Sequence, residues 1–249
     1  MTTNGWLQIA IFAAAVFLVA RPLGHYLVRV YDGSLRWLSP AERAIYRLAG
    51  IDADEDQHWT RYAAAVLLFS AVSMLLTYLV LRLQRLLPLN PQGLVALPPR
   101  QAFETAAAFA TNTNWQSYSG ESTVSYWSQM TQLAFHNFVS AAVGMSVAVA
   151  LVRGIARRSA GKLGNFWVDT VRGTLYVLLP GALLLSLLFV QQGAIQNVSP
   201  SLEVTTLEGA KQLLAMGPVA SQEAIKQLGT NGGGFFNANS AHPFENPTP

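Results

Sequence analysis

The 249-residue sequence contains no cysteine and little charge. Without cysteine, the chain forms no disulfide, thiol nucleophile or cysteine-ligated zinc site. Only 12% of its residues are charged, about half the fraction usual in soluble domains. Hydrophobic residues make up 51%, and the mean hydropathy is +0.30. The net charge of +3 is small, and we expect no nucleic-acid partner. This composition is typical of a membrane protein.

Four uncharged stretches are long enough to cross a lipid bilayer, which takes about 20 apolar residues. They lie at 2–20, at 62–81, within 122–152 and at 173–190. Pro180 predicts a kink in the last of them. A cleaved signal peptide is an alternative for the first stretch, but no basic residue precedes its apolar core and no small-residue cleavage site follows. We therefore predict an all-α membrane protein.

Arginine and lysine are concentrated in two of the connections between these spans. The residues concerned are Arg21, Arg29, Arg36, Arg43, Arg47, Arg61, Arg153, Arg157, Arg158, Lys162 and Arg172. Cytoplasmic loops carry an excess of basic residues. This rule places both connections in the cytoplasm, and it places the N-terminus and everything after Val190 outside.

Two segments on the predicted outer side resemble each other. FETAAAFATNTNWQSYSGES follows the second span, and QEAIKQLGTNGGGFFNANSA follows the fourth. Aligning their glutamates also aligns Thr111 with Thr230 and Asn112 with Asn231. Each segment predicts a short helix that ends at Thr-Asn and continues into a polar loop. The repeated order of span, short helix and loop indicates an internal duplication.

Physical chemistry suggests what such a repeated unit does. A short helix entering from outside directs the negative end of its dipole inward. Irregular backbone at membrane depth is tolerated only where it is buried in protein or lines a cavity. Rings of backbone carbonyls replace the hydration shell of a cation in potassium filters. Gly232, Gly233 and Gly234 permit close approach and unusual dihedrals. These features favour a cation path lined by main chain.

Other interpretations of the same motifs remain open at this point. The glycine run is also compatible with a flexible external loop. A phosphate-binding loop is disfavoured because no lysine follows the glycines. In the third span, one helical face carries Gln129, Gln132, His136 and Ser140, which either line a cavity or bond to neighbouring helices. We expect Asp169 and Arg172 to be solvated at the membrane edge.

The long run LEVTTLEGAKQLLAMGPVASQEAIKQLGTNGGGFFNANSAHPFENPTP and the earlier TNTNWQSYSGES resemble the A subunits of the Kdp potassium-importing P-type ATPases. The resemblance covers the whole chain. It implies the potassium transporter superfamily, which includes the Trk, Ktr and HKT proteins and is built from repeated membrane-helix/pore-helix/membrane-helix units. It also implies a potassium-binding and translocating subunit of an ATP-driven, high-affinity uptake complex in the bacterial inner membrane.

The resemblance further implies partners and a division of labour. A B subunit hydrolyses ATP, and small C and F subunits complete the complex. This chain lacks the phosphorylated aspartate motif of P-type pumps, so we expect a non-catalytic subunit. K⁺ is the transported ion, and no organic cofactor is expected. Along the chain we expect an extra N-terminal transmembrane helix (1–22) and a cytoplasmic loop (23–61). A first pore unit (62–152) then consists of helix 62–85, pore helix 100–110, filter 111–116 and helix 123–152, and a second cytoplasmic loop (153–172) follows it. An incomplete second pore unit (173–249) consists of helix 173–190, extracytoplasmic linker 191–220, pore helix 221–229 and filter 230–236.

Carried onto this sequence, the family's filter positions form two groups. We expect K⁺ to be bound, mainly by main-chain carbonyls, at Thr111, Asn112, Thr113, Asn114 and Gln116, and at Thr230, Asn231, Gly232, Gly233 and Gly234. Neither group contains the TVGYG run of ordinary potassium channels, so we expect an asymmetric filter. The family has four pore units around one ion path, whereas this chain has two pore loops. We interpret the chain as the N-terminal part of a longer protein or as the product of an interrupted gene. The alternatives are another Trk/Ktr-like cation transporter subunit, or a structural membrane subunit that does not conduct.

Overall fold

The computed structural model describes residues 2–157 and 161–248. Arg158, one of the basic residues of the second cytoplasmic connection, lies outside this part. Four long helical segments, here called rods, dominate the described residues and confirm the all-α class. The first rod is α1 (Thr3–Tyr31), and the second is α3 (Trp59–Leu83) with a 3₁₀ turn at Gln84–Leu86. The third consists of α6 (Tyr126–Ser128), a π-helical segment (Gln129–Ala134) and α7 (Phe135–Ala156), and the fourth of α8 (Phe166–Arg172), a π-helical segment (Gly173–Leu178) and α9 (Leu179–Gln191).

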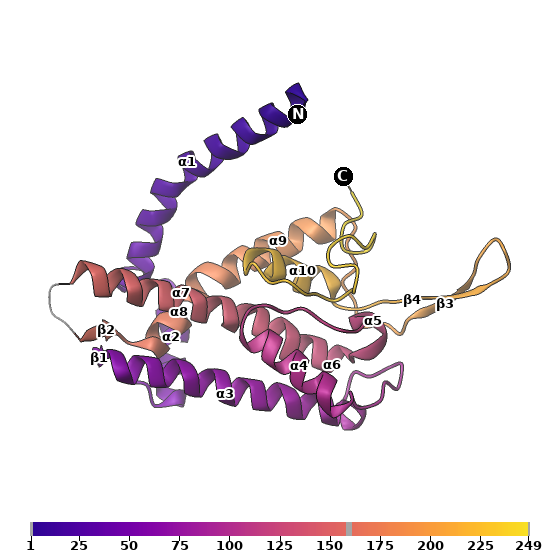
Figure 1. Ribbon diagram of the computed structural model, residues 1–249, viewed down its shortest axis with the longest axis horizontal. Helices are drawn as coiled ribbons and strands as arrows, with labels where there is room; N and C mark the ends of the chain where they lie inside the picture. Colours follow the sequence, from indigo (N-terminus) through magenta and orange to yellow (C-terminus); the bar gives the residue numbers. More distant parts are fainter. Residues whose placement is uncertain (1, 158–160, 249) are drawn as a thin grey trace.

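Shorter elements fill the connections between the rods. The helices are α2 (Ser39–Ala49), α4 (Pro99–Ala110), α5 (Gly120–Thr123) and α10 (Val219–Leu228). Strands β1 (Gln57–His58) and β2 (Lys162–Gly164) form an antiparallel pair, and β3 (Leu202–Thr205) and β4 (Lys211–Leu214) form an antiparallel hairpin. Helices α4 and α10 lie where the sequence predicted pore helices. The β3–β4 hairpin lies in the predicted linker and projects from the molecule (Figure 1).

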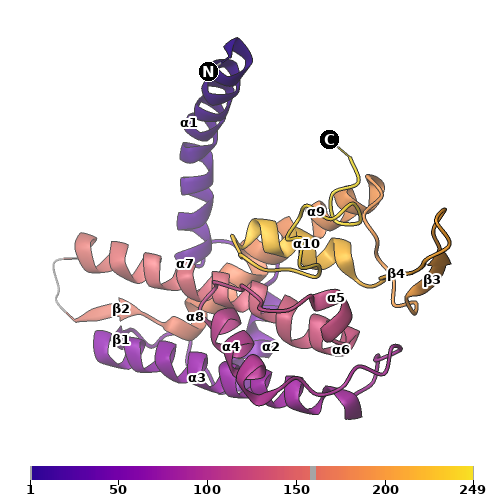
Figure 2. The same cartoon turned by 45° about the vertical axis from the view of Figure 1, so that its right-hand side comes forward.

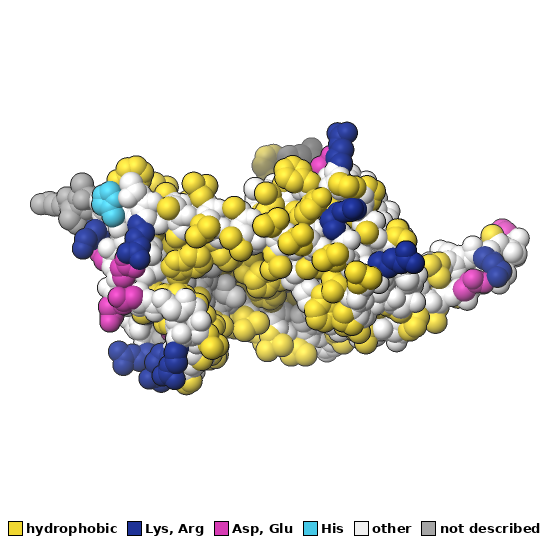
Figure 3. Space-filling view, turned by 90° about the horizontal axis from the view of Figure 1, so that it is seen from below, with side chains coloured by type: hydrophobic (Ala, Val, Ile, Leu, Met, Phe, Trp, Pro, Cys, Tyr) yellow, Lys and Arg dark blue, Asp and Glu magenta, His cyan; other side chains and the backbone are white. Residues whose placement is uncertain are grey.

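The second, third and fourth rods form a bundle, with the two short pore-like helices at one end of it (Figure 1). Helix α4 packs on α3 and contacts α7, while α10 packs on α9 and contacts α7 (Figures 1 and 2). Helix α7 therefore lies between the two repeated units. On the face shown in Figure 3, hydrophobic side chains cover the middle, and charged side chains gather toward the ends. This is the distribution that a bilayer requires of a spanning protein.

Helix α1 differs from its predicted bounds. It continues through Pro22 to Tyr31 rather than ending at 22, and α2 forms within the predicted loop 23–61. A proline removes one helical hydrogen bond, and membrane helices tolerate that loss. The helix stands away from the bundle, with only Val30 and Tyr31 buried at its end (Figure 1). Its apolar surface is compatible with lipid contact along most of its length.

The fourth rod is irregular next to Pro180, where the sequence predicted a kink. Pro180 has no N–H, so the Tyr176 carbonyl loses its usual helical donor. The Tyr26 hydroxyl of α1 donates a hydrogen bond to that carbonyl instead. The π-helical segment Gly173–Leu178 directly precedes the proline. One bond from α1 thus satisfies the polar group that Pro180 leaves free.

The predicted solvent exposure of Asp169 and Arg172 is wrong. Asp169 is buried and pairs with Arg153, with Nη1 and Oδ2 2.6 Å apart. Arg172 pairs with the buried Glu42 of α2 at 2.8 Å. Burial acts to raise the pKa of Glu42, but hydrogen bonds from Arg172 and two tyrosines outweigh it and lower the pKa below its ordinary value. These pairs join α2, α7 and α8, because a charge removed from water needs an opposite charge beside it.

Candidate ion-binding site

The loops that follow α4 and α10, 111–116 (the first loop) and 230–236 (the second loop), each have a left-handed residue two positions beyond the end of the preceding helix. This residue is Asn112 (φ 64°) in the first loop and Thr230 (φ 56°) in the second, and Asn114 is also left-handed (φ 57°). Asparagine adopts this conformation readily, whereas a β-branched threonine is strained there. Since Asn112 and Thr230 take the same place, the helix ends are one position out of step with the alignment that matches Thr111 to Thr230.

Side chains join the two loops. The Asn231 amide donates to the Oδ1 atoms of Asn112 at 2.5 Å and Asn114 at 3.0 Å. The Asn112 amide donates to the Gly229 carbonyl at 3.2 Å. Both loops are therefore held side by side, although Asn114 and Asn231 are 117 positions apart in the chain.

Glycine is required in the second loop by close approach. A Cβ on Gly232 would lie 2.5 Å from the Trp115 ring and would overlap the Thr113 carbonyl oxygen. A Cβ on Gly233 would overlap the Asn114 carbonyl oxygen. The predicted unusual dihedrals lie elsewhere, because neither glycine has a positive φ. These glycines let two backbones touch.

The main chain of both loops has a consistent orientation. The N–H of Asn114 donates to Ala108 at 2.9 Å, and the N–H of Asn231 donates to Lys226 at 3.0 Å. A trans peptide points its carbonyl away from its N–H. The carbonyls of Thr113 and Thr230 therefore point away from α4 and α10. Within the described part of the chain, the carbonyls of 111–115 and 230–234 accept no hydrogen bond.

Side chains of the first loop mostly brace it rather than face outward. The Thr111 hydroxyl donates back to the Ala107 carbonyl of α4 at 2.9 Å. The Gln116 Oε1 accepts the N–H of Gly234 at 3.2 Å, which ties the two loops together a second time. The chemistry left for a ligand is thus mainly that of backbone oxygens, which suit a dehydrated cation.

The predicted polar face of the third rod contacts both the first loop and α3. Ser140 donates to Asn112 Oδ1 at 2.7 Å and so touches the first loop. His136 Nδ1 donates to the Gln132 carbonyl, 2.8 Å away, and the side chains of His136 and Gln132 both contact Thr77 of α3. Sequence reasoning missed Asn137, which is fully buried and contacts Asn114. An asparagine in an otherwise apolar span was the available signal.

Comparisons with known proteins decide the family. The family model described as "Potassium-transporting ATPase A subunit" matches residues 10–249. The chain belongs to this family. Relatives named potassium-transporting ATPase potassium-binding subunit are 60% identical in Methylorubrum extorquens and 58% identical in Solibacter usitatus. Each match covers 100% of this chain and 44% of the relative. The chain thus spans less than half the length of these A subunits.

Behind the second loop of this A-subunit chain lies a buried charged cluster that the sequence did not predict. The Lys226 ammonium donates to Ser240 at 2.6 Å and lies 3.3 Å from Glu223. Glu245 accepts the N–H groups of Phe236 at 3.2 Å and Ser240 at 2.9 Å. Burial raises the pKa of Glu245 to about 7, the charge of Glu223 adds to this rise, and Lys226 opposes it. The cluster holds the end of the second loop against α10.

The two units of this family member are therefore not equivalent. Where the second unit has Lys226, the sequence alignment places Ala107 in the first. The first loop is backed by an apolar cluster that includes Phe109 and Tyr118. The second loop thus has a charged support, and the first loop has an apolar one.

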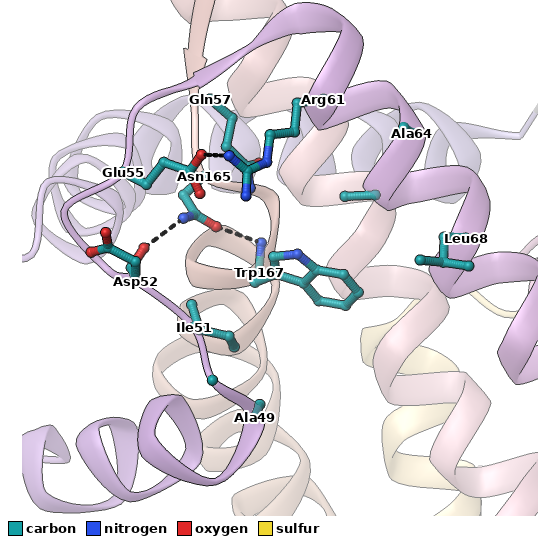
Figure 4. A pocket seen from close by; sticks show the side chains of 12 residues that line it. Ala49, Ile51, Asp52, Glu55, Gln57, Arg61, Ala64, Leu68, Asn165 and Trp167 are labelled. Carbon is teal, nitrogen blue, oxygen red and sulfur yellow. Dashed lines mark hydrogen bonds and ion pairs between the residues drawn. The ribbon is translucent and has the colours of Figure 1, made fainter.

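One hollow of about 330 Å³ is lined by Trp115 and Gln116 of the first loop together with Glu104 and Thr105 of α4. A cavity of about 420 Å³ is lined by the segment after α2, the start of α3 and the start of α8 (Figure 4). Its polar side chains already have partners: Glu55 pairs with Arg61, and the Asn165 amide donates to the Asp52 main-chain carbonyl. Residues 2–157 and 161–248 contain no group of three His, Asp or Glu side chains arranged to hold a metal ion. The adjoining loops are thus the best candidate for an ion site.

Proposed function

We propose that this chain supplies part of the K⁺-selecting path of an ATP-driven potassium uptake complex. The observation that carries the proposal is the pair of touching loops whose carbonyls accept no hydrogen bond in the described part of the chain. The relatives named potassium-binding subunits support K⁺ as the ion. K⁺ is bound mainly by main-chain oxygens of 111–114 and 230–234.

The physical roles follow from the two helices. The α4 and α10 C-termini carry partial negative charge and end at the loops, which favours a cation there. Hydrogen bonds between the side chains of Asn112, Asn114 and Asn231 resist movement of the loops, so the main-chain oxygens are in place before the ion arrives. The two loops form one side of the ion path, which continues toward an ATP-hydrolysing B subunit in a complex with C and F subunits.

The same proposal fixes the orientation in the membrane. The basic connections lie in the cytoplasm, and α4, α10 and the β3–β4 hairpin face outward from the bacterial inner membrane. The N-terminus is extracytoplasmic. K⁺ therefore enters the two loops from outside, and ATP is hydrolysed on a different subunit.

Replacing Gly232 in the full-length subunit tests this function against a structural role. Gly232→Asp adds a side chain where the Thr113 carbonyl lies, and adds a charge beside the proposed ligands. We expect a loss of K⁺ affinity or selectivity in ion uptake by the assembled transporter. Leu207→Asp adds the same charge at a fully exposed position of the β3–β4 hairpin and serves as the control. Unchanged K⁺ selectivity in Gly232→Asp would favour a scaffold.

A further inference from the structure

A chain of hydrogen bonds that begins and ends on α7 runs through the side chains of both loops. Its members are Asn137, Asn114, Asn231, Asn112 and Ser140. Starting from Asn137 on α7, the successive bonds measure 3.0, 3.0, 2.5 and 2.7 Å and return to α7 at Ser140. Residues three apart on a helix lie on one face. One face of α7 thus holds the first loop at Asn112 and Asn114, and these two residues in turn hold Asn231 of the second loop.

Asn137 has contacts with both units. Its Oδ1 accepts from the Asn114 amide. Its backbone carbonyl lies at the end of α10, where a Cβ on Gly229 would be only 2.9 Å away. Asn114 is fully buried and is held by three bonds: its N–H to Ala108, and its side chain to Asn137 and Asn231. The peptide that carries the Thr113 carbonyl is therefore fixed in part by Asn137.

The polarity of Asn137 is not explained by stability alone. Its Nδ2 is buried without a partner among the described residues. A buried donor without a partner is unfavourable, and an apolar side chain of similar shape avoids that loss. An apolar residue at position 137 would remove the acceptor of the Asn114 side chain, and Asn114 would no longer be held in its position against α7.

We propose that Asn137 is a positioning residue that determines ion selectivity by holding the Thr113–Asn114 peptide against the second loop. The proposal rests on the proposed function, since it concerns the same oxygens. Selection between K⁺ and a larger or smaller cation depends on the size of the cage and on the number and stiffness of its carbonyls. Loosening the first loop changes the geometry of the carbonyl cage, but every carbonyl ligand remains.

The experiment compares variants in the assembled transporter with the full-length subunit. The variants are Asn137→Ala, Asn114→Ala, the double variant, Gly232→Asp and the control Ser146→Ala. Ser146 is on the same helix, and its hydroxyl bonds to Ala142 and Thr170, not to either loop. Half-saturating K⁺ and Rb⁺ concentrations and maximal rates are measured for each.

We expect Asn137→Ala to change the ratio of the half-saturating Rb⁺ and K⁺ concentrations by about fivefold, the effect of losing one hydrogen bond to a neutral group. The maximal rate should remain within about twofold, since no ligand is lost. Because Asn137 acts through Asn114, the double variant should match Asn114→Ala alone. A ratio equal to that of Ser146→Ala, or additive effects in the double variant, would overturn the proposal.

The remaining outcomes are also informative. If Asn137→Ala does not assemble, Asn137→Leu, which is of similar size and also removes the acceptor of Asn114, carries the same test. Failure of both to assemble would show a purely structural role and overturn the proposal. If Gly232→Asp shifts K⁺ selectivity while Asn137→Ala does not, only the role of Asn137 is rejected. If neither variant shifts K⁺ selectivity, the proposed function itself fails.

Discussion

The contact between Gly233 and Asn114 allows a quantitative prediction for Gly233→Ala. The added methyl would overlap the Asn114 carbonyl oxygen and lie 2.7 Å from its carbonyl carbon. Both are backbone atoms, so they cannot move aside as a flexible side chain would. Restoring an ordinary contact distance requires the two loops to separate by about 1 Å or more, since carbon atoms pack best at about 3.5–4.0 Å.

This separation of the two loops should weaken K⁺ binding. Overpacking of a tight contact costs about 1–3 kcal/mol. If that strain opposes the ion-bound arrangement, K⁺ affinity falls by about 5- to 150-fold, since every 1.4 kcal/mol is tenfold. The half-saturating K⁺ concentration for uptake by the assembled transporter measures it. The maximal rate should change less.

A matched substitution separates this steric effect from a general effect of alanine. Gly144 lies in α7 with no atom within 4 Å of an added Cβ, so Gly144→Ala should leave K⁺ affinity unchanged. Alanine also favours a helix over glycine by about 1 kcal/mol. If Gly233→Ala binds K⁺ as Gly144→Ala does, the close approach of the two loops is not part of the ion site, and the reasoning is refuted.

Two further predictions concern stability of the full-length subunit. Glu42→Ala leaves the half-buried Arg172 without its partner, so the unfolding free energy should fall by about 2 kcal/mol, between the losses for exposed and buried pairs. Thermal unfolding measures this, and a loss no greater than that of Glu55→Ala, which breaks a more exposed pair, would contradict it. Burial holds the pKa of Glu245 at about 7 instead of 4.5, so the folded state keeps a proton that the unfolded state releases. Stability should therefore decline by up to about 3 kcal/mol as pH rises from 4.5 through 7, and Glu245→Gln should flatten that part of the pH profile of thermal unfolding; an unchanged slope would argue against it.

Much of the fold could be predicted from the sequence because it depends on local properties. A bilayer demands about 20 apolar residues per span, and this sequence has four such stretches. The repeated Thr-Asn motifs indicated where α4 and α10 end, to within one or two residues. The family followed from the same motifs. Candidate site residues were found for the same reason, since a polar, glycine-rich loop is conspicuous in an apolar chain.

Only the tertiary structure decided what touches what. The partner of Asn231 lies 117 positions away, and no local pattern specifies which of its neighbours it will bond. Burial of Asp169 and partial burial of Arg172 likewise depend on partners from other helices, whose charges compensate for the loss of water. The left-handed backbone occurs at Asn112 and Thr230, two residues beyond the ends of α4 and α10, rather than at the glycines. Sequence determined the segments, because hydrophobicity and helix formation are properties of neighbours; packing determined the site, because hydrogen bonds and close approach are properties of residues distant in the chain.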